Sequence, residues 1–155
     1  MLFATARLAE LVALDVDDVR VSARKGVLVI RSGKGDEYRE VPLNALARQV
    51  LDEWLEERPK LAASDERALF VSARGGRLSA RATDSAVRKV AGDAGLRLSA
   101  HTLRHTCLTG MVRSRHDLVV VAELAGHRRL ETTRRYSLPS EADRQAAVDS
   151  LEVEF

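Results

Sequence analysis

The sequence predicts a single α+β domain that is mainly helical and contains a small three-stranded antiparallel sheet. Two observations predict this class. Apolar residues recur at helical spacing over most of the chain, and three short β-prone runs lie close together near its start. The chain has 155 residues, of which 45% are hydrophobic, so it can form one core and is not generally disordered.

The N-terminal part should contain a helix followed by the sheet. Phe3, Leu8 and Leu11 share helical spacing and no capping residue precedes them, so this helix is expected to be under way from the first residues. Hairpin-turn residues at 32–36 separate the second and third β-prone runs. The three expected strands are Val16–Arg20, Val27–Ile30 and Tyr38–Val41.

The remaining elements are expected to be helices, apart from a short extended piece at residues 69–71. A helix starts after Asn44 and is closed by Pro59, and Ser79 caps a basic helix that ends near Gly92 or Gly95. The β-branched run Val119–Val121 would suit a strand, but the cap at Asp117 and the terminal Gly126 favour a helix. Further helices are expected over His101–Arg113, Leu130–Tyr136 and Ser140–Leu151, the last an amphipathic tail.

Positive charge is concentrated in one segment. The chain has a net charge of +2, but residues 71–136 hold 13 Arg or Lys against 5 Asp or Glu, a net of +8. Such segregation is typical of a phosphate-binding face, although an arginine-rich solvated surface gives the same count. No apolar stretch or signal peptide indicates a membrane, so a cytoplasmic protein is expected. The single cysteine, Cys107, excludes an intrachain disulfide and a multi-cysteine zinc site.

His101 and Arg104 are three residues apart and should project from one helix face near its N-terminus. A phosphodiester oxygen would be held there by the helix dipole and the guanidinium. Other interpretations are a capping histidine with a surface arginine, or a metal site formed by His101 and His105. The metalloprotease glutamate and a third ligand are missing, so no metal is expected.

Five ordered motifs carry a resemblance to a known family. In the C-terminal half they are His101-Thr102-Leu103-Arg104-His105-Thr106 (H-x-L-R-H-[ST]), Leu124-Ala125-Gly126-His127 (L-L/A-G-H) and Thr132-Thr133-Arg134-Arg135-Tyr136 (T-T-x-x-Y). Upstream, residues 5–14 are similar to T-G-L-R-x-x-E-L-x-x-L, and Gly33-Lys34-Gly35 with Val41-Pro42-Leu43 is similar to a hairpin lysine segment. Together they resemble the catalytic domain of the tyrosine recombinases, the phage integrase family, over essentially the whole chain.

The resemblance implies the catalytic-domain fold of that family and a reaction that cleaves and rejoins DNA without metal, ATP or other cofactor. Tyr136 would attack the phosphodiester to form a 3′-phosphotyrosine, and Arg7 and Arg104 would stabilise charge on the phosphate. The other implied roles are general acid for Lys34, proton transfer at Tyr136 for His101, and donation to a non-bridging oxygen for His127. Glu10 and His105 match accessory positions that would orient Arg7 and the active-site helix.

Double-stranded DNA is the implied partner. Side chains that face the groove are expected on the helix after Ser79, with Arg81, Arg88 and Lys89 as candidates. The resemblance also implies a tetramer on DNA formed from free monomers. The tail helix at 140–151 would then pass to a neighbouring protomer, or else pack on its own domain.

Two departures from the family pattern bear on these expectations. Thr5-Ala6-Arg7 is one residue shorter than the Thr-Gly-Leu-Arg of the family, which puts the position of Arg7 in question. Residues 1–155 match the catalytic domain alone, without the N-terminal DNA-binding clamp domain and the leading helix. The main hypothesis is a site-specific recombinase, and the alternative is a catalytically inactive or truncated DNA-binding remnant or regulator.

Overall fold

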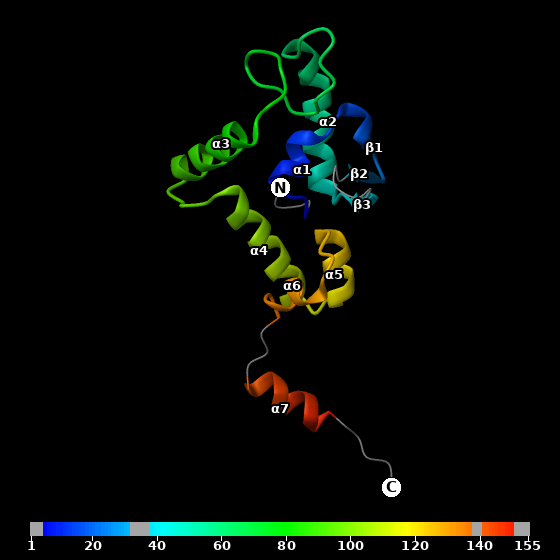
Figure 1. The fold of residues 1–155 in the computed structure, drawn as a ribbon, viewed down its shortest axis with the longest axis vertical. Helices are drawn as coiled ribbons and strands as arrows, with labels where there is room; N and C mark the ends of the chain where they lie inside the picture. Colours follow the sequence, from blue (N-terminus) through cyan, green and yellow to red (C-terminus); the bar gives the residue numbers. More distant parts are fainter. Residues whose placement is uncertain (1–4, 32–37, 138–140, 151–155) are drawn as a thin grey trace.

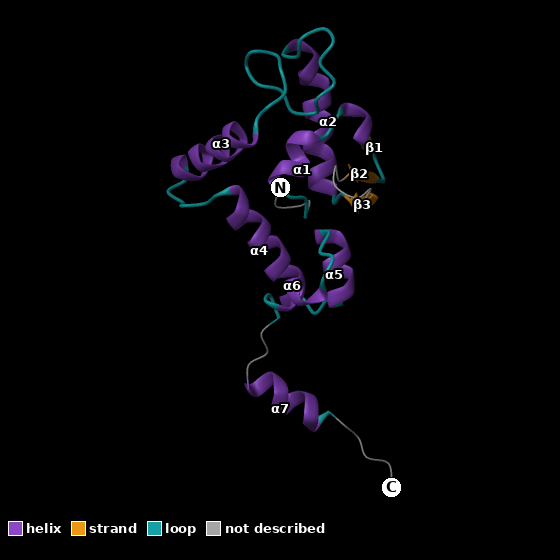
Figure 2. Ribbon diagram, viewed as in Figure 1, coloured by secondary structure: helices purple, strands orange, loops and turns teal. Residues whose placement is uncertain are grey.

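The computed structural model describes residues 5–31, 38–137 and 141–150. Three strands pair antiparallel in the order β1-β2-β3, and helices make up most of the rest (Figure 2). The elements are α1 (Leu8–Ala13), β1 (Val19–Val21), β2 (Gly26–Arg31), β3 (Tyr38–Pro42), α2 (Ala45–Glu57), α3 (Ala80–Asp93), α4 (Ala100–Arg113), α5 (Leu118–Ala125), α6 (Leu130–Arg134) and α7 (Glu141–Asp149). This architecture confirms the expected α+β class.

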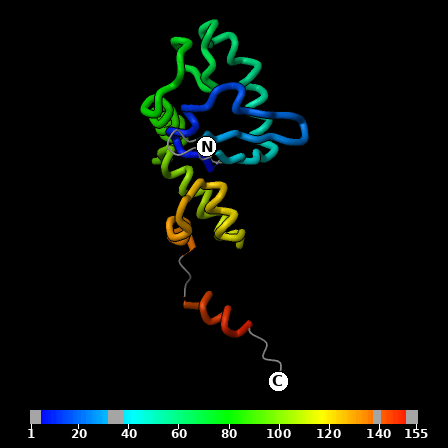
Figure 3. The backbone as a smooth tube through the Cα atoms, turned by 45° about the vertical axis from the view of Figure 1, so that its right-hand side comes forward, coloured from blue at the N-terminus to red at the C-terminus, as the bar shows by residue number. Residues whose placement is uncertain are grey.

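The described residues form two hydrophobic clusters, one in each half. The sheet, α1 and α2 surround the larger cluster, which includes Leu11, Ile30 and Leu69. Leu108, Val121 and Ala125 form the smaller cluster between α4 and α5. Figures 1 and 3 show the two halves stacked end to end, with α3 at one side. Strand β3 contacts α5 where the halves meet, so residues from distant parts of the sequence come together there.

The first helix and the first strand start later than the sequence predicts. Arg7 is extended (φ −73°, ψ 154°) and α1 begins at Leu8, because residues before it are used for contacts with the other half. Thr5, for example, donates its hydroxyl to the carbonyl of Leu124. Residues Val16–Asp18 form a 3-10 turn instead of strand, in which Asp18 accepts a hydrogen bond from the Asp15 N–H at 3.0 Å. Aspartates favour such turns because their side chains satisfy nearby backbone groups.

The predicted helix caps at Ser79 and Asp117 are confirmed, and Asn44 caps α2 in the same way. The side chains of Asn44, Ser79 and Asp117 each accept a backbone N–H in the first turn of the helix that follows. Helix α5 forms despite its run of valines and ends at Gly126, whose φ of +63° is the left-handed conformation that favours glycine. The sequence was sufficient to predict these helix ends because each depends only on neighbouring residues in the chain.

Helix α7 lies within the predicted tail helix at 140–151. All of its residues are exposed, and Figure 1 shows it standing apart from α4, α5 and α6. Within the described ranges, no helix is both long enough and apolar enough to cross a membrane.

Candidate active site

Arg104 lies at the centre of a polar cluster between the two halves and is only 9% exposed. Its Nη2 donates to the carbonyl of Ala125 at the end of α5 at 2.8 Å. Its Nη1 is buried and has no hydrogen-bond partner within the described part of the chain. Leaving a buried charged donor unpaired costs free energy, so this atom is suited to receive an anion.

His127 follows Gly126 directly and bridges Arg104 to α6. Its Nε2 is 3.3 Å from Nη2 of Arg104, and its Nδ1 is 2.7 Å from Oγ1 of Thr133, which is fully buried. Because a guanidinium can only donate, Nε2 acts as the acceptor and Nδ1 carries the proton. Burial, followed by repulsion from Arg104 and Arg7, lowers the pKa of His127 to about 4. The imidazole is therefore neutral near neutral pH.

The lowered pKa of His127 predicts a loss of stability in acid. In the unfolded chain the His127 imidazole is protonated as the pH falls below its ordinary pKa of 6.5. In the folded protein it is protonated only near pH 4. The free energy of unfolding should therefore decrease as the pH is lowered from 6.5 to about 4. The decrease should be smaller in His127→Gln, because glutamine does not take up a proton. Urea titrations of both proteins across the window measure this difference. Equal slopes against pH would contradict the assignment of a neutral, buried imidazole.

Arg7 and Glu10 link the start of α1 to the end of α5. Nη2 of Arg7 donates to the carbonyl of Gly126 at 2.5 Å, and Nη1 donates to Oε1 of Glu10 at 2.7 Å. Glu10 also accepts the backbone N–H of Arg7 at 2.6 Å, which fixes the first turn of the helix. Burial lowers the pKa of Arg104 most and Arg7 lowers it further, so the two guanidinium groups are close enough to repel. The shorter sequence before Arg7 has not removed it from the site.

Tyr136 lies against two histidine rings. Its ring is parallel to that of His127, at a centroid distance of 6.3 Å, and meets the ring of His105 edge-on at 5.0 Å. The phenol ring also packs on the Leu108, Val121 and Ala125 cluster. His105 neighbours Arg104 in α4, so the chain brings the predicted nucleophile, both histidines and Arg104 into one cluster.

Two predicted residues are not part of these contacts. His101 is exposed in the first turn of α4, and its side chain forms no hydrogen bond, ion pair or ring contact with the described residues. Its predicted part in proton transfer stays a prediction, and His105 makes the ring contact with Tyr136 instead. Lys34 lies outside the described residues.

The candidate DNA-contact residues lie on α3, apart from the cluster. Arg81, Arg88 and Lys89 are all exposed. Arg88 pairs with Asp84 at 2.6 Å, and Asp84 also accepts the backbone N–H of Ala100 at 2.9 Å. The basic helix is thereby joined to the first turn of α4, one turn before Arg104.

Sequence reasoning missed Arg39 of β3. Its Nη1 and Nη2 donate to the two carboxylate oxygens of Glu10 at 3.0 and 2.8 Å, and its Nε donates to the carbonyl of Leu124 at 3.3 Å. Burial opposes ionisation of Glu10, but the hydrogen bonds from Arg39 and Arg7 outweigh it and lower the pKa of Glu10 to about 2. One signal was available: Arg39 is two residues before the buried Val41, so strand alternation places this charged residue on the inward face.

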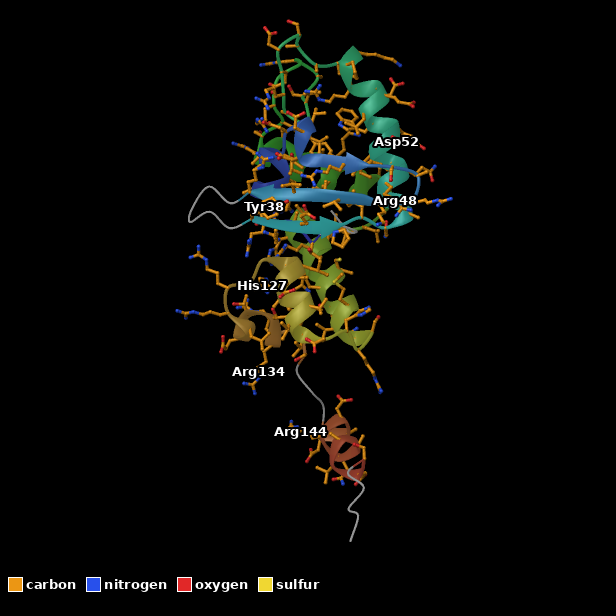
Figure 4. All side chains as sticks on the ribbon, turned by 90° about the vertical axis from the view of Figure 1, so that its right-hand side faces the viewer. Tyr38, Arg48, Asp52, His127, Arg134 and Arg144 are labelled. Carbon is orange, nitrogen blue, oxygen red and sulfur yellow. The ribbon has the colours of Figure 1, made fainter. Side chains whose placement is uncertain are left out.

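A cleft of about 460 Å³ opens beside the cluster, between β3 and the end of α5. Figure 4 shows Tyr38 on the sheet and His127 on the helical half, on either side of it. Among the described residues, the hydrogen-bonded cluster joins the guanidinium groups of Arg7 and Arg39 to the carboxylate of Glu10, and Arg104 lies close to them. Chemically, this arrangement can bind an anion beside a phenol.

Comparisons with known proteins identify the family and the fold. The model of the phage integrase family matches residues 1–142. The tyrosine recombinase XerC of Chromohalobacter salexigens is 42% identical over 133 residues, which are 84% of this chain and 43% of that protein. The XerC of Corynebacterium efficiens is 41% identical over 153 residues, 94% of this chain and 48% of that protein. This chain thus spans less than half the length of these curated relatives.

Solved structures share the fold. XerH site-specific recombinase bound to its difH substrate before cleavage superposes with a TM-score of 0.82 at 33% identity, covering 97% of this chain and 44% of that one. The catalytic domain of bacteriophage HP1 integrase gives a TM-score of 0.61 at 20% identity, covering 96% of this chain and 76% of that one, which is likeness of fold. With the family model matched over most of its length, this chain belongs to the phage integrase family.

Proposed function

We propose that this chain is the catalytic domain of a site-specific DNA recombinase that cleaves and rejoins DNA through a 3′-phosphotyrosyl link to Tyr136. The observation that carries the proposal is the buried guanidinium of Arg104: its Nη1 has no hydrogen-bond partner among the described residues, and Arg7, His127 and Tyr136 lie around it. A phosphodiester supplies the oxygen that this donor lacks and the phosphorus that a phenol can attack. Relatives that are named recombinases, one of them solved on its DNA substrate, support the same reaction.

Arg104 and Arg7 would bind the non-bridging oxygens of the phosphate. The five-coordinate transition state places more negative charge on these oxygens than the ground state does, so preorganised cations lower the barrier. Arg104 is held by Ala125, and Arg7 by Gly126 and Glu10, before any DNA is bound. The cluster therefore needs little rearrangement during the reaction.

His127 would become a donor once the phosphate is bound. In the free protein it accepts from Arg104, and burial together with the nearby arginine side chains depresses its pKa. The bound phosphate neutralises those cations and attracts a proton to Nε2, which then donates to a non-bridging oxygen. Thr133 keeps the ring oriented through Nδ1.

The covalent step exchanges one phosphate ester for another. The Tyr136 oxygen loses its proton and bonds to phosphorus, while the bond from phosphorus to the 5′-oxygen breaks. His101 and Lys34 are the family-implied groups that assist removal of the phenolic proton and protonate the 5′-oxygen. Attack by a free 5′-hydroxyl on the phosphotyrosine reverses these events, so religation needs no other energy source.

The wider interface would involve α3 and α7. Arg81, Arg88 and Lys89 would contact DNA, since exposed ion pairs such as Lys89–Asp93 are weak and exchange readily for phosphates. Tetramer formation on DNA would use α7, whose exposed faces offer a surface to a neighbouring protomer. We place this activity in the cytoplasm, where a lone thiol such as Cys107 stays reduced.

DNA affinity should fall steeply with salt. Each Arg or Lys that neutralises a phosphate releases a counterion, so Arg81→Ala and Lys89→Ala should each reduce the slope of log affinity against log salt by about 1. Fluorescence anisotropy between about 50 and 200 mM salt measures the slopes. Lys60→Ala is the control. Lys60 follows α2 and pairs with Glu57, the last residue of that helix, so it is not part of α3. A slope unchanged in the α3 variants would remove α3 from the interface.

A nicked suicide substrate tests the proposed function itself. The fragment beyond the nick diffuses away after cleavage, so the covalent intermediate accumulates and migrates as a shifted band on a denaturing gel. We expect this band with Mg²⁺ chelated and without ATP. DNA binding without any such band would instead favour a non-catalytic DNA-binding domain.

A further inference from the structure

Arg39 joins three separate segments of the active-site cluster, although it lies on the sheet. It reaches Glu10 in α1 through both terminal nitrogens, and the carbonyl of Leu124 in α5 through Nε. Its side chain is 15% exposed and that of Glu10 is 12% exposed, so this bidentate ion pair is largely removed from water. A fork-to-fork pair of this kind fixes orientation as well as distance.

The end of α5 is shaped around the same guanidinium. A Cβ at Gly126 would lie 2.6 Å from Nη1 of Arg39 and would displace this guanidinium, so the glycine, whose φ is +63°, leaves room for Arg39 beside the backbone. The carbonyl of Gly126 accepts from Arg7, and His127 is the next residue. Arg39 thus lies against the segment that contains both the carbonyl acceptor of Arg7 and the His127 ring.

Charge balance gives Arg39 a second effect. Within the described ranges, Glu10 is the only carboxylate bonded to Arg7, and a carboxylate that bonded to Arg7 alone would compete with phosphate for it. Arg39 donates to both oxygens of Glu10 and takes up part of its charge. The positive charge of Arg7, whose side chain is 45% exposed, therefore stays available to a phosphate that approaches from solvent.

We propose that Arg39 is a positioning residue for catalysis: it acts through Glu10 to set the placement and charge of Arg7, and through the end of α5 to set His127. The assignment rests on the proposed recombinase function. Since Arg39 has its donors on Glu10 and Leu124, it is not itself expected to touch the DNA.

Arg39→Lys tests the assignment, because lysine keeps the charge but cannot donate to both oxygens of Glu10 and to Leu124 together. We expect the single-turnover rate of covalent adduct formation at saturating DNA to fall by about 10- to 100-fold, the scale for loss of a supporting contact. DNA affinity should stay within a fewfold of wild type. Arg20→Lys is the matched control, an exposed arginine of the same sheet that pairs with Glu40, and should leave the rate unchanged.

The double variant with Glu10→Gln separates positioning from general weakening. Because part of the effect of Arg39 passes through Glu10, the double variant should lose less than the product of the two single losses, whereas independent structural damage would multiply them. Rates are measured well below each unfolding midpoint, found by thermal denaturation. A wild-type rate in Arg39→Lys, or multiplied losses in the double variant, overturns the assignment while leaving the proposed function intact. Absence of adduct from wild type itself overturns both.

Discussion

Tyr136→Phe should abolish the covalent protein–DNA adduct while leaving DNA affinity nearly unchanged. The substitution removes one oxygen atom, and the phenyl ring retains its contacts with His105 and His127. Folding and phosphate binding by Arg104 should therefore persist, whereas no nucleophile remains to attack phosphorus. Adduct on a suicide substrate and affinity by anisotropy are measured on the same preparation.

Tyr38→Phe is the matched control for that substitution. Tyr38 is the other tyrosine of the chain, and it lines the cleft that also contains His127. Its hydroxyl hydrogen-bonds to Glu40, which raises the pKa of Tyr38 and disfavours the phenolate that attack requires. Adduct formation should survive in Tyr38→Phe. If the adduct persisted in Tyr136→Phe and vanished in Tyr38→Phe, Tyr38 would be the nucleophile instead.

Arg104→Ala should lower the rate of cleavage on the order of a thousandfold, the scale for removing a donor that stabilises transition-state charge. The loss should appear in the rate at saturating DNA, because the guanidinium matters most when charge develops on the phosphate. Some stability should be lost as well, since the Ala125 carbonyl loses its bond from Arg104.

Two further substitutions separate geometry from charge in this result. Arg104→Lys keeps a cation but cannot reach Ala125 and a phosphate at once, so it should recover only part of the rate. Arg113→Ala removes an exposed arginine from the far end of the same helix and should cleave like wild type. Cleavage by Arg104→Ala within a fewfold of wild type would exclude Arg104 from the reaction.

Elements that depend on local chemistry could be predicted from the sequence. Ser79 and Asp117 cap helices because their oxygens accept N–H groups two or three residues ahead, and Gly126 ends α5 because it adopts a left-handed conformation. These signals outweighed the strand preference of the valines in α5. The predicted start of α1 was wrong because Thr5 and Arg7 form hydrogen bonds with the end of α5, 119 residues away in sequence. A local sequence pattern does not show such long-range bonds.

The candidate site was predictable where a motif named a residue and less so where packing decides. Arg104, His127 and Tyr136 were named by their motifs, and the structure brings them together. Arg39 was missed because its significance lies in partners from α1 and α5. His101 and His105 are one turn apart on α4, and it is the tertiary structure that brings His105 against Tyr136.

Mapping the DNA-linked peptide tests the central claim most directly. After reaction with the suicide substrate, trypsin and nuclease, mass spectrometry should find a nucleotide joined through a 3′-phosphate to the peptide that begins at Tyr136, since cleavage after Arg135 and Arg144 isolates it from Tyr38. We expect this linkage on Tyr136 alone. A nucleotide attached to Tyr38, to a serine or to a histidine, with Tyr136 unmodified, would contradict it.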